Sequence, residues 1–339
     1  MMSKLASLER EILAPSEALV ADMAKIDGDI LLLGVAGKMG PSMAKVAKRA
    51  VEATGVKKRI IGVSRFSNPA TKADLEAAGI ETLSADLLDD AALQALPEVP
   101  NVIYLAGQKF GTTGKEAFTW AMNTYLPGRV AEKYRNARIV AFSTGNVYPF
   151  SPLSQNGYSE EHPAEPIGEY GQSCLGRERI FQYFSEKYDI PTLIYRLNYA
   201  VDFKYGVLLE IAKSVQNGQP IDLRTGHVNV IWQGDANEIA LRSLLHCQTP
   251  AKLLNVTGPE TASVKWLAYQ FGLLFGKEPI FEGQPHDSAL LSNASEAHRL
   301  FGYPRVTLKQ MIELIYQWLV AGGELIEKPT HFQERAGKF

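Results

Sequence analysis

Short apolar runs alternate with amphipathic stretches through the first two hundred residues. The runs lie at Asp29–Leu33, Arg59–Val63, Glu81–Leu83, Asn101–Leu105, Arg138–Phe142 and Thr192–Leu197. Between the first two, apolar residues recur at the helical spacing and the pattern ends near Gly55. Nearly continuous apolar strands that alternate with helices predict an α/β fold with a doubly wound parallel sheet, covered on both faces. Ligands of such sheets bind at the carboxyl ends of the strands.

The same pattern divides the chain into three parts. Residues 1–28 precede the first strand and predict a helix capped by Ser16, packed on the main domain or used in a dimer contact. Residues 29–200 carry the alternation. Residues 201–339 predict a smaller α/β lid, some segments of which return to the main domain, with helices near 207–217, 235–247, 263–275 and 308–321. The polar segment 328–339 is either a frayed end or folds back over the lid.

Composition narrows the functional classes. The 339 residues carry a net charge of −2, which gives no reason to expect nucleic acid or an anionic membrane as partner. Only Cys174 and Cys247 are cysteines, which excludes a disulfide scaffold and suits the cytoplasm. Charged residues at 9–11 interrupt the start, and no run of about 18 apolar residues follows, so we expect neither signal peptide nor membrane span. The histidines lack ligand spacing, so no metal is expected.

A glycine-rich loop follows the first predicted strand and opens the first predicted helix. Gly34, Gly37 and Gly40 are spaced for a tight turn, with Lys38 and Met39 between the last two. Glycine lets the backbone approach a pyrophosphate, whose charge then meets the free amides of a helix N-terminus. The loop therefore predicts a nicotinamide dinucleotide bound in a Rossmann-type domain.

The second predicted strand ends in Ser64 and Arg65. A carboxylate there would accept bonds from the adenosine ribose and favour NAD, whereas a cation can pair with a 2′-phosphate. NADP is therefore favoured over NAD, with Lys38 as a second cation, although Arg65 also fits a solvated loop charge. The loops after the third and fourth strands complete a cofactor-lining set with Asp86, Leu87, Leu105, Ala106 and Gly107.

Together these positions resemble the extended short-chain dehydrogenase/reductase family, the NAD-dependent epimerase/dehydratase group. The family's GxxGxxG matches the glycine loop, its acidic residue beside the adenine matches Asp86, and its STxxVYG segment matches residues 143–148. The resemblance runs from about 29 to 200 and more loosely to about 320. It implies a nicotinamide-dependent enzyme in which Ser143 and Thr144 stand beside the reacting oxygen.

The resemblance fails at one informative position. The family's active-site tyrosine lies in YGxSKxxxE, and here Tyr170, Gly171, Ser173 and Glu178 match while Cys174 replaces the lysine. A free tyrosine has a pKa of about 10, and lowering it to about 7 requires roughly 4 kcal/mol of stabilisation of the phenolate. The family's lysine supplies much of this charge, and a neutral or anionic cysteine cannot.

Three interpretations of this site remain open. A substitute cation acts on Tyr170, with Arg177, one helical turn beyond Cys174, and Lys204 as candidates. Alternatively, Tyr170 stays protonated and donates a hydrogen bond while another group is the base. In the third interpretation catalysis is lost, and the protein binds NADP or a metabolite as a sensor or regulator.

The leading hypothesis is an NAD(P)-dependent oxidoreductase or epimerase acting at a carbinol carbon of a sugar, sugar acid or nucleotide-sugar. Thr144 would hold the reacting oxygen, while Gly145 and Asn146 replace the acid/base pair of the family's dehydratases. Asn198 would line the nicotinamide. A homodimer through helices around 115–135 and 170–188 is implied by the resemblance, with Trp120, Tyr125 and Phe181 as contacts. Candidate substrate contacts are Asn146, Tyr199, Lys204, Trp232 and Gln233.

Overall fold

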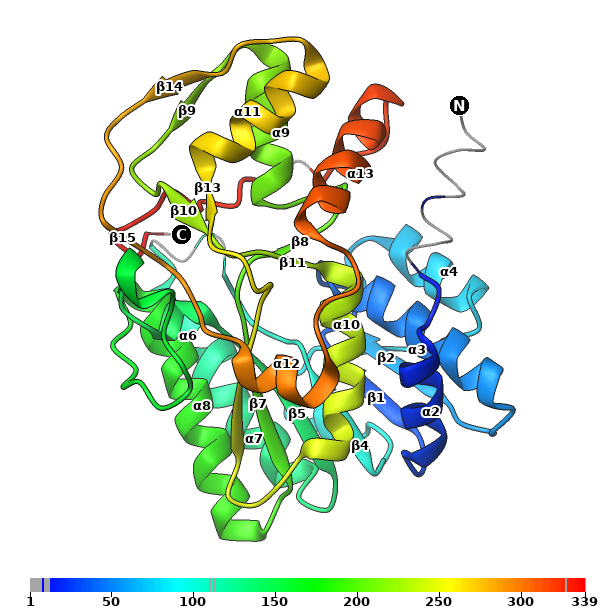
Figure 1. Ribbon diagram of the computed structural model, residues 1–339. Coiled ribbons are helices and arrows are strands. Elements are labelled where there is room, and N and C mark those ends of the chain that lie inside the picture. Colours follow the sequence, from blue (N-terminus) through cyan, green and yellow to red (C-terminus); the bar gives the residue numbers. More distant parts are fainter. Residues whose placement is uncertain (1–7, 9–12, 110, 112–113, 327, 339) are drawn as a thin grey trace.

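The computed structural model describes residues 8, 13–109, 111, 114–326 and 328–338. At its centre lies a seven-stranded parallel sheet in the order β12-β7-β5-β4-β1-β2-β3 (Figure 1). The strands are β1 (Ile30–Leu33), β2 (Ile60–Ser64), β3 (Glu81–Ser84), β4 (Asn101–Tyr104), β5 (Arg138–Thr144), β7 (Thr192–Leu197) and β12 (Lys252–Val256). The doubly wound α/β fold is confirmed, and the six predicted strands end within two residues of their predicted positions.

The seventh strand, β12, was not predicted. Its sequence, KLLNV, is short and contains two polar residues, so its apolar pattern is weak. It pairs in parallel with β7, where Leu254 lies opposite Tyr195. Its polar residue Asn255 is fully buried and accepts a hydrogen bond of 3.0 Å from the Tyr148 hydroxyl. Tertiary packing, rather than the local pattern, makes this segment a strand.

Alternate residues of each central strand face two different apolar layers. In β1, Ile30 and Leu32 face one layer, and Leu31 and Leu33 face the other. Helices α2, α3, α10 and α12 contribute to the first layer, and α5, α7 and α8 to the second. The helices of this domain are α2 (Glu17–Lys25), α3 (Gly40–Thr54), α4 (Pro69–Ala77), α5 (Asp90–Gln94), α6 (Glu116–Trp120), the π-helical turn η1 (Ala121–Tyr125), α7 (Leu126–Lys133), α8 (Gly168–Tyr188), α10 (Gln233–Arg242) and α12 (Ser295–Phe301).

The N-terminal helix α2 packs against α3 and α10. The Ser16 side chain caps it by accepting a 3.0 Å hydrogen bond from the Leu19 amide, as the sequence predicted. Leu19 and Met23 are fully buried in the layer beneath the sheet. This apolar face is therefore covered by the same chain. The rest of the predicted extension, residues 1–7 and 9–12, lies outside the described residues.

The lid has an apolar core of its own. Three helices provide most of it: α9 (Val207–Asn217), α11 (Val264–Phe275) and α13 (Leu308–Val320). Figure 1 shows this group above the carboxyl edge of the sheet, with the C-terminal end of the chain between the two. The remaining short elements are β6 (Ser151–Pro152), β8 (Ala200–Val201), β9 (Pro220–Asp222), β10 (His227–Val228), β11 (Ile231–Trp232), β13 (Ala262–Ser263), β14 (Ile280–Glu282), β15 (Ser288–Ala289), η2 (Gly145–Val147), η3 (Leu153–Gln155) and η4 (Ser243–His246).

Four helical stretches predicted beyond residue 200 are present as α9, α10 with η4, α11 and α13. Of these, α10 returns to the main domain, as do β12 and α12. Among the helices of the described residues, none is long and apolar enough to cross a bilayer.

Candidate active site

The glycine loop between β1 and α3 is shaped by two glycines that the chain itself requires. Gly34 has a φ of +90°, and a β-carbon there would lie 2.8 Å from the Ala106 nitrogen. A β-carbon on Gly40 would overlap the Val35 carbonyl oxygen. Gly37 differs, because it is exposed and a β-carbon there would meet its nearest atom at 3.3 Å. The loop surface at Gly37 is therefore open to a ligand.

Helix α3 begins directly behind this loop. No side chain caps its N-terminus at Met39, so the first amides and the positive end of the helix dipole are free to meet an anion. An uncapped terminus behind an open glycine loop fits the pyrophosphate of a dinucleotide. Lys38 turns away from the end of β2, because its ammonium donates to the Ala200 carbonyl at 2.7 Å and lies 3.9 Å from the Tyr205 ring centre. The geometry thus does not support Lys38 as a partner of a 2′-phosphate.

The carboxyl ends of the first four strands form one edge. The Leu105 amide donates to the Leu33 carbonyl at 2.8 Å, and the Ala85 amide donates to the Ser64 carbonyl at 3.0 Å. Arg65 lies exposed at the end of β2. This edge brings together the cofactor residues predicted outside the glycine loop on these four strands: Ser64, Arg65, Asp86, Leu87, Leu105, Ala106 and Gly107.

A cavity of about 230 Å³ lies between this edge and the lid. Thr144, at the end of β5, is hydrogen-bonded to Tyr170, in the first turn of α8. The Thr144 hydroxyl also donates to the Asn146 side-chain oxygen at 3.1 Å. The structure therefore places the predicted tyrosine and threonine side by side. The lining residues are Lys38, Met39, Lys109, Ser143, Thr144, Asn146, Tyr170, Leu197, Asn198, Tyr199, Ala200, Tyr205, Gly206, Val207 and Thr330.

The surroundings of Tyr170 oppose its ionisation. Burial raises the pKa of the Tyr170 hydroxyl well above its ordinary value, and Cys174 raises it further. Arg177 and the hydrogen bond between Tyr170 and Thr144 act in the opposite direction. Cys174 is itself fully buried, and burial raises the pKa of its thiol. At neutral pH, and without a bound ligand, Tyr170 is therefore a neutral hydroxyl and Cys174 a neutral thiol.

Lys109 is a cation in this cavity that the sequence analysis missed. Its ammonium lies 5.9 Å from the centre of the Tyr170 ring. The residue is half-buried, and this burial lowers the pKa of Lys109 to about 8. Burial also lowers the pKa of Lys38 to about 7, and the charge of Lys109 contributes. Lys109 follows Gly107 by two positions in the loop after β4, which is where ligands of parallel sheets bind.

Arg177, a predicted substitute for the missing lysine, does not line the cavity and is hydrogen-bonded to other groups near Tyr170. Its guanidinium donates to the Phe142 carbonyl at 2.8 Å and to the Asn123 side-chain oxygen at 2.7 Å. Asn123 lies in η1 and also bonds both backbone groups of Gln108, at 2.8 and 2.9 Å. The loop that carries Lys109 is therefore fixed to the same amide that holds Arg177.

Ser143 belongs to a buried ionic network beneath the cavity. Its hydroxyl donates to the Glu178 carboxylate at 2.5 Å, and Arg196 of β7 forms an ion pair with the same carboxylate at 2.6 Å. Arg196 also donates to the Tyr148 hydroxyl at 2.6 Å. Both members of the ion pair are at most 2% exposed. Because Ser143 donates its hydroxyl proton to Glu178, this proton is not available to a ligand. The bond instead fixes the end of β5.

Three predicted substrate contacts are not brought to this cavity. Trp232 is 1% exposed and lies in the lid core, 5.8 Å from the Phe203 ring. Gln233 is directed to Ser42 of α3, to which it donates at 3.0 Å. The Lys204 ammonium lies over the Trp318 ring at 5.3 Å, so it does not substitute for the missing lysine beside Tyr170. Their positions after β7 suggested a common site, but Trp232 and Lys204 contact aromatic rings of the lid, and Gln233 joins α10 to α3 of the main domain.

Asn198 and Tyr199, the proposed nicotinamide and substrate contacts, both line the cavity. The Asn198 amide donates to Asn229 at 2.7 Å, and Tyr199 has an unusual positive φ of 42°. Such a backbone conformation is disfavoured for a bulky residue and is common at functional sites. Within the described residues, no group of three or more His, Cys, Asp or Glu side chains gathers into a metal-binding cluster.

Solved structures of nucleotide-sugar enzymes share this fold. The chain is similar to the Bacillus cereus UDP-glucuronic acid 4-epimerase in complex with UDP-glucuronic acid and NAD, with 18% identity, a TM-score of 0.70, and 86% of this chain and 99% of that one covered. The Thermus thermophilus UDP-glucose 4-epimerase complex with NAD matches with 18% identity, a TM-score of 0.69, and 85% and 98% covered.

A dTDP-glucose 4,6-dehydratase from Bacillus anthracis in complex with NAD matches with 17% identity, a TM-score of 0.73, and 87% and 97% covered. No curated protein sequence matches the chain significantly. The sequence model of the NAD dependent epimerase/dehydratase family matches residues 30–244, more than half of the chain. Its members are enzymes, so the expectation of an enzyme is confirmed at the level of the family. The chain belongs to the NAD-dependent epimerase/dehydratase family.

Proposed function

We propose that this protein is an NAD(P)-dependent oxidoreductase or epimerase that acts at a carbinol carbon of a sugar, sugar acid or nucleotide-sugar. The observation that carries the proposal is the hydrogen-bonded pair of Thr144 and Tyr170, which faces a cavity shared with the glycine loop. When bound, the nicotinamide accepts or donates a hydride at such a carbon. Net transfer gives a dehydrogenase, and transient oxidation gives an epimerase.

Residues of the chain itself transfer the proton of the reacting hydroxyl. Thr144 holds the reacting oxygen by a hydrogen bond, and Tyr170 takes or returns its proton. Lys109 supplies the positive charge that Cys174 cannot, because its ammonium faces the Tyr170 ring at 5.9 Å. Arg177 adds to this charge from behind, although its hydrogen bonds keep it away from the cavity. The amide of Asn146 would orient a further hydroxyl of the ligand.

The dinucleotide would be held by the glycine loop, by the free amides of α3 and by the edge residues of β2 to β4. We favour NADP over NAD because β2 ends in Ser64 and exposed Arg65 rather than in a carboxylate. Calorimetric titration with NAD+, NADH, NADP+ and NADPH tests this directly. Micromolar binding with the phosphorylated pair preferred supports the assignment, and an Arg65→Ala variant should lose that preference. Failure of all four to bind would refute the dinucleotide site.

The roles of the catalytic pair are tested on the dinucleotide-loaded protein with sugars and sugar acids as substrates. Thr144→Val and Tyr170→Phe should each reduce turnover by about 100-fold or more while leaving dinucleotide affinity within a few fold. Absorbance of the reduced nicotinamide measures turnover. Full turnover in both variants would overturn the assignment of these roles.

The alternative is a non-catalytic protein that binds NADP or a metabolite. The high pKa of Tyr170 and the neutral Cys174 beside it favour this alternative. It predicts dinucleotide binding without hydride exchange on any sugar. It also predicts that Tyr170→Phe changes ligand affinity alone.

We further propose a homodimer formed through α6, η1 and α8. Phe118, Trp120, Tyr125 and Tyr183 are large apolar side chains that are 37–60% exposed on these elements. Phe181, which the sequence suggested as a contact, is 1% exposed and packs against Tyr104 inside the subunit. Sedimentation should show a dimer that Tyr125→Glu dissociates. A cytoplasmic location is proposed because both cysteines are free thiols.

A further inference from the structure

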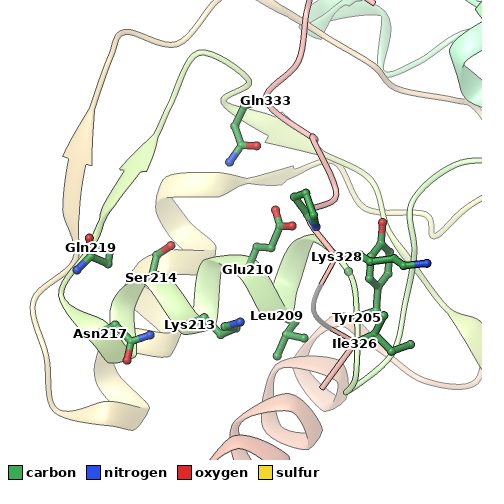
Figure 2. Close-up of a pocket in the computed structure, with 12 residues that line it drawn as sticks. Tyr205, Leu209, Glu210, Lys213, Ser214, Asn217, Gln219, Ile326, Lys328 and Gln333 are labelled. Carbon is green, nitrogen blue, oxygen red and sulfur yellow. The ribbon is translucent and has the colours of Figure 1, made fainter. Parts of the chain in front are cut away.

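The segment 328–338, which we call the strap, is anchored to the lid. The Glu210 carboxylate on α9 accepts hydrogen bonds from the Thr330 backbone amide and from its hydroxyl, the latter at 2.7 Å. Figure 2 shows the strap running past α9, with the Glu210 side chain directed toward it. Phe332 is 2% exposed within the apolar core of the lid. The first half of the strap is therefore packed rather than frayed.

The second half of the strap is anchored near the sheet edge. The Arg335 guanidinium donates to the backbone and side-chain oxygens of Ser288, both at 2.9 Å, and lies 3.9 Å from the Phe150 ring centre. Gly337 packs on the backbone at Gly168, so closely that neither glycine could carry a side chain without displacing the other. Since Gly168 begins α8, the strap ties the lid to the helix that carries the catalytic tyrosine.

The strap forms part of the cavity wall. Thr330 lines the cavity together with Tyr170 and Thr144. A second depression of about 450 Å³ is lined by Glu210 and Lys213 of α9 and by Lys328 and Gln333 of the strap (Figure 2). The two hollows share only Tyr205 and Gly206 among their lining residues.

Size limits what this cavity can hold. Its volume of about 230 Å³ is below the range of roughly 300–1,000 Å³ that is usual for pockets which bury a drug-sized ligand. The nicotinamide ring must occupy part of it. The strap borders this cavity through Thr330, so a nucleotide-sugar that extended past Thr330 would meet the strap. Within a largely apolar lining, Asn146, Asn198 and Thr330 are hydrogen-bonding groups, and Lys38 and Lys109 are cations.

We propose that the strap closes the site to nucleotide-sugars, so that the substrate is a free sugar or sugar acid of monosaccharide size. This inference rests on the proposed function and narrows its substrate class. The similar structure of the UDP-glucuronic acid 4-epimerase holds a nucleotide-sugar. In this chain, Thr330 would instead contact the substrate as a specificity-determining residue at the closed end of the cavity.

The experiment loosens the strap and measures nucleotide binding. The double variant Glu210→Ala/Arg335→Ala removes both side-chain anchors, and Lys338→Ala, an exposed position on the same strap, is the matched control. Calorimetry measures the Kd of UDP, UDP-glucose and UDP-glucuronic acid, with and without saturating dinucleotide. Thermal unfolding checks that each variant is folded, and the two single variants replace the double one if it is not.

We expect the full chain and Lys338→Ala to bind none of the three ligands with a Kd below about 1 mM, and the loosened variant to bind UDP at least about tenfold more tightly. Micromolar binding of UDP-glucose by the full chain would overturn the inference but leave the proposed function intact. A folded, loosened variant that gains no affinity would also overturn it. Failure of the proposed function is seen separately, in the dinucleotide titration and in the absence of hydride transfer.

Discussion

Replacing Lys109 by methionine removes the ammonium that faces Tyr170 and keeps a side chain of similar length. With the 5.9 Å between the ammonium and the ring centre taken as the separation of the charges, and an effective dielectric constant of about 20, the attraction between the ammonium and a phenolate is about 3 kcal/mol. This corresponds to about two pKa units, or a roughly 100-fold change in the phenolate population at neutral pH. We therefore expect Lys109→Met to lower kcat for alcohol oxidation by about 100-fold at pH 7, measured by nicotinamide absorbance.

The pH profile distinguishes a charge effect from a structural one. Burial lowers the pKa of Lys109 to about 8, so in the wild-type protein oxidation should decline as the pH rises above about 8 and the ammonium is lost. Lys109→Arg keeps its charge throughout this range, so it should retain activity and shift the decline to higher pH. Lys109→Met should not show this decline of activity above pH 8, because it has no ammonium to lose.

Loss of stability should not complicate this comparison. Because the pKa of Lys109 is lower in the folded state, the unfolded chain binds more protons between about pH 8 and 10.5. Stability therefore rises with pH through that window, and below it the buried ammonium costs free energy. Lys109→Met is expected to be as stable as the wild type at pH 7, by urea denaturation. An activity within threefold of the wild type in this variant would refute the proposed role of Lys109.

Three further predictions concern the cofactor loop, the buried ion pair and the cysteine. Gly37→Val should weaken dinucleotide binding by tenfold or more in calorimetry without loss of stability. Gly40→Ala should instead destabilise the fold, because a β-carbon at Gly40, unlike one at Gly37, overlaps the backbone of the loop. Arg196→Met leaves the Glu178 carboxylate buried without its cation and should lower the unfolding free energy by about 3–5 kcal/mol in urea. Cys174→Lys should reduce kcat, since the buried site already holds an ammonium nearby, while Cys174→Ser should stay close to the wild type; a gain in kcat for the lysine variant would show a degraded site of the ordinary kind.

The sequence predicted the fold because its signals are local. Buried parallel strands such as Ile30–Leu33 are nearly continuous apolar runs, and the glycine loop follows the first of them directly. The strand Lys252–Val256 was missed because its partners, Tyr148 and β7, lie far away in the sequence. Local periodicity carries no information about such contacts.

Within the candidate site, the sequence predicted the residues that belong to the family's motifs and missed others, such as Lys109. Thr144 and Tyr170 were found from their motifs and are hydrogen-bonded in the structure. The direction of a lysine side chain is not encoded in its spacing, so Lys204 was considered as the substitute cation and Lys109 was not. The same limit applies to Trp232, whose aromatic ring suited a sugar but is buried in the lid core.

The two hydrogen bonds between Asn123 and the backbone of Gln108 have a thermodynamic consequence. In the family pattern, the tyrosine and its cation are four residues apart on one helix, so their separation is fixed by secondary structure. Here, on the proposed role of Lys109, the cation comes from the loop that packs on Gly34 at the dinucleotide edge. A ligand that shifts Lys109 relative to Tyr170 then also changes the acidity of Tyr170. Linkage makes the effect reciprocal: dinucleotide binding at the proposed site and ionisation of the tyrosine each shift the equilibrium of the other.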